Sequence, residues 1–247
     1  MEVKVNAFVI KSIDYKDNDK LLTLYSLESG KITASIKGVK KSGAKLKFAS
    51  EPFCFAEYIL AEKSGRYTVI NASYIDSFYN LRLDLKKYYA CAVVGEILNC
   101  FAEPDVSDKT LFSLAINAIK DICYNGEEVL TLCSFLHGVI NSLGYGISDY
   151  TCACCGSVIS GRVFFNFKNG VFSCQNCLKE GFNEIKQQTY NALLSMVSGT
   201  LNSEIFNESQ LYLVKFLLYY LSYKTDVKLK SGDALISFLG GNIEGSK

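Results

Sequence analysis

Residues 19–42 read DKLLTLYSLESGKITASIKGVKKS and contain the pattern that decides the fold of the N-terminal part. Two apolar, β-prone runs, residues 21–27 and 32–36, lie on either side of a short turn that contains Gly30. Runs of this kind around a glycine-containing turn predict a β-hairpin. The second run leads directly into a segment rich in lysine, so the hairpin and the main cluster of positive charge are neighbours in the chain.

Three further β-prone runs flank this hairpin at residues 3–10, 53–60 and 66–70, and a turn at Lys63-Ser64-Gly65 joins the last two. Five short strands within the first 76 residues predict a small closed barrel, because closure leaves no strand edge exposed. The OB-fold is the natural candidate. An SH3-like barrel has the same number of strands, so the strand count alone does not decide between them.

From about residue 82 the apolar residues recur every three or four positions, which is typical of amphipathic helices. This pattern covers residues 111–122, with Ser107 as the expected N-cap, and continues at 129–143. Residues 211–221 are apolar nearly all round, which predicts a helix buried in a bundle. The fold class is therefore α+β: an OB-fold barrel over 1–80, an α-helical domain over 81–149 and 183–247, and a zinc ribbon inserted at 150–182.

The inserted module is predicted from its cysteines. Two Cys-x2-Cys pairs, Cys152 with Cys155 and Cys174 with Cys177, are separated by 18 residues. This is a zinc-binding spacing, since two cysteines three positions apart can direct both sulfurs at one ion. Asn169-Gly170 between apolar runs predicts the hairpin that brings the pairs together. A cluster of reduced thiols without metal is the alternative.

The expected cofactor is one structural Zn²⁺ ion, because four thiolates complete a tetrahedral shell and leave no position for a reacting water. Cys154 is left over as a spare thiol, although it could replace a member of the first pair. The only histidine, His137, lies in an apolar helical pattern and is expected to belong to the core. The other five cysteines are scattered among apolar residues and are expected to be buried thiols, since the cytosol does not favour disulfides.

The charge is unevenly distributed. The formal net charge is only +1, which excludes a wholly basic nucleic-acid binder. Residues 31–47, here called the lysine segment, nevertheless hold six lysines and no acid, and the rest of the chain has 20 basic and 25 acidic residues. Its glycines give it freedom to follow a phosphate backbone, and phosphate contacts supply affinity by releasing counterions. The candidate DNA-binding residues are Lys37, Lys40, Lys41, Lys45 and Lys47, with Lys11 and Arg66.

Aromatic and acidic residues lie near the lysine segment in the sequence. OB-fold surfaces add stacking aromatic rings to a positive groove, and the sequence offers Tyr15, Phe48, Phe53 and Tyr67, each more typical of a core position. Three acids, Asp14, Asp17 and Asp19, lack the glycine that shapes a calcium loop and are expected to form a solvated turn. A solvated lysine loop without a partner remains the alternative to a DNA surface.

Several classes of protein are disfavoured. The chain has no phosphate-loop, dinucleotide-binding, zinc-protease or serine-hydrolase motif, so we expect no catalysis. Its first residues lack the apolar core of a secretory signal. The longest apolar stretch, residues 211–221, is about half of the roughly 20 residues that a membrane span needs, and it contains Lys215. We therefore expect a soluble cytoplasmic protein, associated with the nucleoid and without a membrane partner.

The order of these parts is similar to that of the bacterial RecO recombination-mediator family over nearly the whole chain. The pieces that carry the resemblance are residues 7–12, 19–31, 36–42 and 81–85 and the two cysteine pairs. Two features depart from the family pattern. Lys16-Asp17 stands where a glycine-glutamate pair is common, and the basic segment has lysines alone where arginines are frequent. Lysine is a point charge without the bidentate fork of arginine, which still permits phosphate contact.

The resemblance implies a non-enzymatic role in recombinational DNA repair. It implies binding to single- and double-stranded DNA, annealing of complementary strands without ATP, and help in loading the recombinase. The implied partners are RecR and the single-strand DNA-binding protein. Two alternatives remain open: a zinc-containing scaffold whose lysine segment contacts an acidic protein, and a zinc enzyme that acts on nucleic acid.

Overall fold

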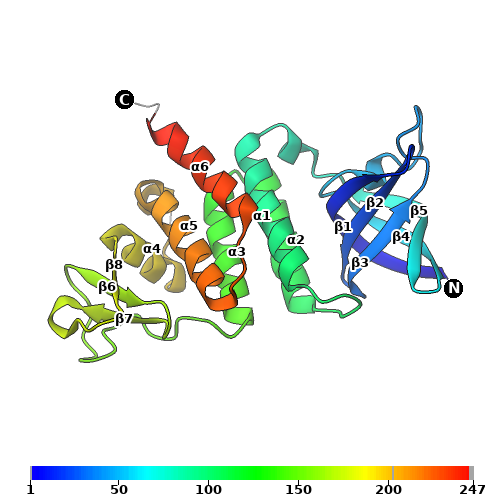
Figure 1. The fold of residues 1–247 in the computed structure, drawn as a ribbon. Coiled ribbons are helices and arrows are strands. Elements are labelled where there is room, and N and C mark those ends of the chain that lie inside the picture. Colours follow the sequence, from blue (N-terminus) through cyan, green and yellow to red (C-terminus); the bar gives the residue numbers. More distant parts are fainter. Residues whose placement is uncertain (1, 202, 245–247) are drawn as a thin grey trace. The chain divides into compact units, whose positions relative to one another are not determined.

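The computed structural model describes the backbone of residues 2–201 and 203–244. The chain divides into two compact units, residues 1–124 and residues 125–247, and each is described by itself. The first unit contains a β-barrel and two helices, and the second contains a small sheet among helices (Figure 1). No helix among the described residues is long and apolar enough to cross a bilayer.

The first unit begins with the predicted five-stranded closed barrel, drawn from blue to cyan in Figure 1. The strands are β1 (Glu2–Tyr15), β2 (Asp19–Ser26), β3 (Gly30–Ile36), β4 (Phe55–Lys63) and β5 (Arg66–Asp76). Around the barrel they follow the order β1-β2-β3-β5-β4, with a parallel pairing between β3 and β5 and antiparallel pairings elsewhere. This connectivity is that of an OB-fold, which the strand count alone could not establish.

Alternating apolar residues fill the barrel. Val5, Ala7 and Val9 of β1 are fully buried, and β2 to β5 contribute their own inward-facing residues to the same core. Tyr58 of β4 is also fully buried, and its hydroxyl donates a hydrogen bond of 2.9 Å to the carbonyl of Ala49. Ala49 lies in η1 (Phe48–Ser50), the short helix that directly follows the lysine segment. The polar tip of a core side chain therefore anchors this segment to the barrel.

The turn between β2 and β3 requires glycine. Gly30 has a φ of +62°, and a Cβ at this position would lie 2.0 Å from the carbonyl oxygen of Val106. Both the conformation and the close approach exclude a larger residue. The predicted hairpin turn is thus also the point where the backbone near Val106 packs against the barrel.

Two helices complete the first unit. After η2 (Tyr79–Arg82), Asp84 caps α1 (Leu85–Phe101) by accepting hydrogen bonds from the backbone of Lys86 and Lys87. At α2 (Lys109–Tyr124) the expectation of Ser107 as the N-cap is wrong: the Asp108 carboxylate accepts the Leu111 N–H, whereas the Ser107 hydroxyl donates to the carbonyl of Leu27. Asp and Ser are comparable N-cap residues, so sequence alone does not separate adjacent candidates.

The second unit consists of helices and the three-stranded sheet β7-β6-β8. Its elements are α3 (Glu128–Ser142), β6 (Val163–Asn166), β7 (Val171–Cys174), η3 (Gln175–Cys177), β8 (Asn183–Ile185), α4 (Gln187–Val197), α5 (Ser203–Thr225) and α6 (Lys230–Glu244). Phe165 of β6 contacts Phe172, Phe216 and Tyr220, and these rings connect the sheet with α5. The expectation that α5 is buried all round is only partly correct, because Tyr212, Tyr219 and Tyr223 are exposed.

Candidate metal centre and lysine surface

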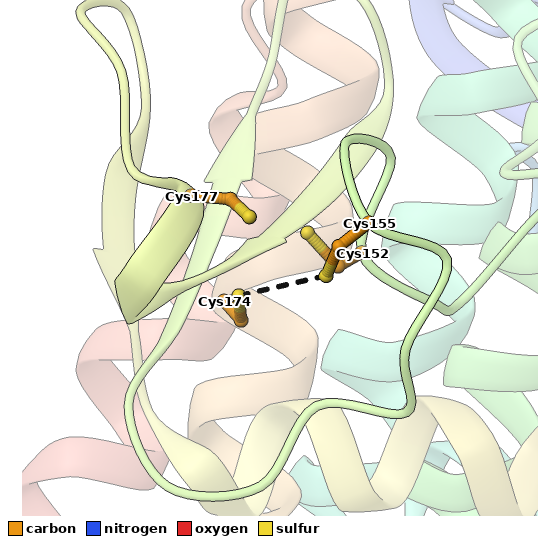
Figure 2. Close-up of side chains that lie close together, drawn as sticks. All are labelled: Cys152, Cys155, Cys174 and Cys177. Carbon is orange, nitrogen blue, oxygen red and sulfur yellow. Dashed lines mark hydrogen bonds between the residues drawn. The ribbon is translucent and has the colours of Figure 1, made fainter.

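The four predicted ligands come together in the second unit. The sulfur atoms of Cys152, Cys155, Cys174 and Cys177 all lie within 4.8 Å of one another. Figure 2 shows Cys152 and Cys155 on one loop, facing Cys174 at the end of β7 and Cys177 in η3. Two chain segments separated by the β6–β7 hairpin thus present four sulfurs to one point, which is the arrangement of a four-thiolate metal site.

Backbone hydrogen bonds shape the first of these segments. The Gly156 N–H donates to the carbonyl of Cys152 over 2.8 Å, and the Cys152 N–H donates to the carbonyl of Ser157 over 3.0 Å. The resulting tight turn requires a φ of +70° at Gly156, as the sequence predicts. The Ala153 N–H donates to the carbonyl of Phe172 over 2.9 Å, which attaches the turn to β7. The ligand geometry is therefore supported by the sheet.

The electrostatics of the cluster favour a bound cation. Burial raises the pKa of the Cys152 thiol, but backbone hydrogen bonds, led by that from Cys174, outweigh burial and lower this pKa to about 5. The pKa of Cys177 is instead raised, because its sulfur contacts those of Cys174 and Cys155 and a further negative charge there is unfavourable. A divalent ion removes this repulsion between thiolates.

Cys154 does not belong to the cluster that the structure brings together. The Cys154 side chain is exposed, whereas Cys152 and Cys155 on either side of it both belong to the four-cysteine cluster. The prediction that Cys152 and Cys155 form the first pair, with Cys154 as the additional thiol, agrees with this geometry. The described residues thus offer a possible metal site of four cysteines.

In the first unit, the lysine segment lies on the barrel surface. The side chains of Lys37, Lys40, Lys41, Lys45 and Lys47 are all exposed. Within the described part of the chain, the segment has one ion pair, in which Lys40 Nζ lies 2.7 Å from Asp14 Oδ2. Lys31, at the beginning of the segment, donates to the carbonyl of Asn99 over 2.7 Å. Four of the five predicted lysines therefore have no carboxylate partner among the ion pairs of the described residues.

The segment is more ordered than its glycines suggest. Successive turns hold it through backbone hydrogen bonds from Lys41 to Gly38, from Ala44 to Lys41 and from Lys47 to Ala44, each 3.1–3.2 Å long. Val39 is 2% exposed and packs into the barrel core, which fixes the chain between Lys37 and Lys40. The lysine segment thus forms a folded ledge, here called the lysine ledge, on the barrel surface.

Two of the three acids that were expected to form a solvated turn, Asp14 and Asp19, hold this ledge in place. The Asp19 carboxylate accepts the Gly38 N–H over 2.8 Å, and the carbonyl of Asn18 accepts the Lys40 N–H over 3.2 Å. Together with the ion pair of Asp14 and Lys40, these bonds join the tip of the β1–β2 hairpin to the lysine segment. Residues 16–19, with Lys37, Gly38 and Lys41, line a shallow depression of about 400 Å³. Lys16 was not among the candidate DNA contacts named from the sequence.

The remaining candidates lie elsewhere on the barrel. Lys11 is exposed on β1 opposite Thr23, and Arg66 is exposed at the start of β5 opposite Lys63. Among the described residues, no side-chain hydrogen bond or ion pair joins Lys11 or Arg66 to the lysine segment, although Tyr67, next to Arg66, pairs with Ala34 of β3. Among the aromatic candidates Tyr15 is 44% exposed, with Lys16 Nζ 5.2 Å from its ring centroid, whereas Phe53 is 4% exposed.

Phe48 and Tyr67 are half-buried and pack against the barrel core. Of the four aromatic residues weighed from the sequence, only Tyr15 therefore offers an exposed ring beside lysines. Tyr74 of β5 is also exposed, at 59%, and Phe48 contacts it at 6.1 Å between ring centroids. The sequence pattern of β5 does not predict that the Tyr74 side chain faces outward.

Comparisons with known proteins agree with this architecture. The family model "Recombination protein O N terminal" matches residues 1–78, and "Recombination protein O C terminal" matches residues 82–233. A DNA repair protein RecO from Clostridium novyi is 28% identical over 233 residues, which cover 92% of this chain and 91% of the relative. One from Desulforamulus reducens is 28% identical over 250 residues, which cover 97% and 96%. The chain belongs to the RecO family of DNA repair proteins.

Proposed function

We propose that this protein is a non-catalytic recombination mediator that binds single- and double-stranded DNA on its barrel and anneals complementary strands without ATP. The observation that carries the proposal is the ledge of exposed lysines, which a nearly neutral chain concentrates on one segment of an OB-fold. Lysine ammonium groups attract phosphates and release their counterions, and this supplies affinity without regard to sequence. Ammonium groups between two strands also reduce the repulsion of their phosphates.

Lys37, Lys40, Lys41, Lys45 and Lys47 are the proposed contacts, with Lys11 and Arg66 at the periphery. The test is binding of a fluorescent oligonucleotide at low salt by the K40E/K41E variant. We expect its affinity to be lower by on the order of tenfold or more, since two phosphate contacts become repulsive. K109E/K120E, a double charge reversal at exposed positions on α2 of the same unit, is the matched control. Wild-type affinity of K40E/K41E would contradict the proposal.

The proposed cofactor is one structural zinc ion held by Cys152, Cys155, Cys174 and Cys177. The support is the donor set itself, because four thiolates favour zinc over the hard cations that prefer oxygen ligands. With four sulfur ligands the ion has no open position, so its role is to hold the two ligand segments and the small sheet together. Metal analysis of the purified protein tests this identity, and one zinc per chain is the expected result.

RecR and the single-strand DNA-binding protein are the proposed protein partners, as the family implies. In the second unit, a groove of about 540 Å³ between α5 and α6 is lined by Leu218, Leu229 and Ile236. Its charged residues are Lys215, Lys228 and Asp233, so positive charge is in excess. This combination fits an acidic chain end with an apolar anchor. A K215E/K228E variant is expected to lose binding to the single-strand DNA-binding protein and to keep its affinity for a bare oligonucleotide. Unchanged binding of both would contradict this assignment.

A further inference from the structure

One wall of the groove between α5 and α6 is supported by the small sheet of the second unit. Tyr219 of α5 lines this groove and is 57% exposed. Its ring meets that of Phe167, the residue that follows β6, edge to face, with the two centroids 4.8 Å apart. An aromatic pair of this geometry is attractive and favours one arrangement of the two rings. The groove is therefore shaped in part by a residue that lies between the two cysteine pairs.

The turn of the β6–β7 hairpin packs closely against α5. The Lys224 ammonium group donates a hydrogen bond of 2.6 Å to the carbonyl of Lys168. At Gly170, where φ is +68°, an added Cβ would lie 2.5 Å from the hydroxyl oxygen of Tyr220. The ring of Tyr220 also contacts that of Phe165 in β6, with centroids 5.4 Å apart. The turn therefore has no space to shift unless side chains of α5 shift with it.

The other end of the hairpin belongs to the cysteine cluster. Cys174 is the last residue of β7 and pairs with Val163, the first residue of β6. The loop of the first cysteine pair is attached to β7 by the hydrogen bond of 2.9 Å from Ala153 to Phe172. The strands of this sheet have only three or four residues, and modules this small depend on a metal or on neighbouring elements for their shape. A metal bound by the cluster therefore fixes the position of the hairpin.

Aromatic contacts form a continuous path from the cluster to the groove. Phe172, in the same strand as Cys174, contacts Phe165 with ring centroids 4.8 Å apart. Phe165 contacts Phe167 at 5.0 Å, and Phe167 contacts Tyr219 on the groove wall. In a close-packed chain of side chains, a shift of one ring requires a shift of the next, which couples the two ends.

We propose that a metal bound by the four cysteines controls the affinity of the groove for an acidic peptide. Phe167 is the positioning residue: it contacts Tyr219, and Tyr219 contacts the peptide. With the metal bound, the hairpin holds Tyr219 on the wall that also includes Lys215 and Leu218. Loss of the metal releases the hairpin and loosens this wall. The proposal rests on the proposed partner groove and deepens it, because it gives the metal a role in partner recognition besides stability.

The first arm of the test measures binding of a labelled peptide, with several aspartates and an apolar C-terminal residue, to the full metal-loaded chain. Phe167→Ala is expected to lower the affinity by about three- to tenfold, since it removes one aromatic contact. Phe167→Tyr keeps the ring and should bind like the wild type. Tyr212→Ala removes an exposed ring of α5 outside the groove lining, and this matched control should change nothing.

The second arm removes the metal. Chelation of the wild type, at a temperature where its helical circular dichroism is unchanged, should lower peptide affinity by a similar factor, and added Zn²⁺ should restore it. Phe167→Ala should lose little further affinity on chelation, because the metal acts through the contact that this variant lacks. Oligonucleotide affinity, which we assign to the barrel of the first unit, should stay constant in both arms.

The proposal is overturned if Phe167→Ala binds the peptide like the wild type, if chelation leaves the wild-type affinity unchanged, or if chelation weakens both proteins equally. Should Phe167→Ala lose its helical signal, Phe167→Leu takes its place, since it keeps an apolar side chain without the ring. A metal-loaded wild type that does not bind the peptide would refute the groove assignment and this proposal with it. Peptide binding that is insensitive to the metal would refute this proposal alone.

Discussion

The ammonium group of Lys40 lies 2.7 Å from the carboxylate of Asp14, and this pair joins the lysine segment to the tip of the β1–β2 hairpin. The hydrogen bond from Lys40 lowers the pKa of Asp14, so the carboxylate stays ionised at neutral pH. A bound phosphate must compete with this carboxylate for Lys40. The pair therefore orders the ledge in the free protein and limits what Lys40 contributes to DNA affinity.

Removal of the competing charge is expected to strengthen DNA binding. In Asp14→Asn, Lys40 becomes available to a phosphate, and single-strand affinity at low salt should rise a few-fold. The dependence of log K on log salt should steepen by about 0.7, the value for one further phosphate contact on a single strand. Titration of a labelled oligonucleotide measures both quantities. Weaker binding by Asp14→Asn would show that the pair serves DNA binding by positioning Lys40.

A matched pair of cysteine variants tests the proposed zinc site. Cys152→Ser removes one of the four clustered sulfurs and is expected to lower the melting temperature by several degrees, because a bound metal stabilises the fold. Cys154→Ser changes an exposed thiol outside the cluster and should melt like the wild type. A chelator should lower the wild-type melting temperature toward that of Cys152→Ser. Equal melting of both variants would contradict the assignment of the first pair.

His137 is expected to make stability depend on pH. Burial lowers its pKa, and Asn141 Nδ2 lies 3.4 Å from its Nδ1, in a position to donate to the neutral ring. The unfolded chain then binds a proton more readily than the folded one, so this contribution to stability is complete above the unfolded pKa of about 6.5. It is lost as the pH falls below that value.

Urea unfolding at pH 8 and pH 5.5 measures this effect when the wild type is compared with His137→Gln. The wild type should lose more stability than the variant over this interval, since glutamine does not titrate. An equal loss in the two proteins would assign the pH dependence to other groups, such as the four clustered cysteine thiols.

The hydroxyl of Tyr58 is expected to contribute to the stability of the barrel. Burial raises the pKa of Tyr58 well above its usual value, so the hydroxyl keeps the proton that it donates to the carbonyl of Ala49. Tyr58→Phe leaves that buried carbonyl without this donor and should lower the free energy of unfolding by about 1 kcal/mol. Denaturant unfolding measures the change, and a variant as stable as the wild type would contradict this role.

The sequence predicts the barrel and the cysteine cluster well because both depend on local patterns. Strand alternation, Gly30 and the Asn169-Gly170 turn each agree with the fold that the structure shows. The Cys-x2-Cys pairs are likewise local, because the two cysteines of each pair are three positions apart and can direct both sulfurs at one point. β8 has no comparable pattern, because it is only three residues long. Its partner is β6, from which it is separated in the sequence by β7.

Relationships between distant residues were not predictable. Asp14 and Asp19 resemble solvated acids in the sequence, and only the barrel register brings them to Lys40 and Gly38. Such contacts follow from the topology of the closed barrel. The periodicity of a sequence, in contrast, describes each strand or helix by itself.

The salt dependence of single-strand binding tests the lysine ledge most directly. The slope of log K against log salt is measured for the wild type and for a variant with Lys37, Lys41 and Lys45 changed to glutamine. Each lost phosphate contact should reduce the magnitude of the slope by about 0.7, so the variant should show a slope smaller by roughly 2. An unchanged slope would contradict the account, because it would place the DNA phosphates on another part of the protein.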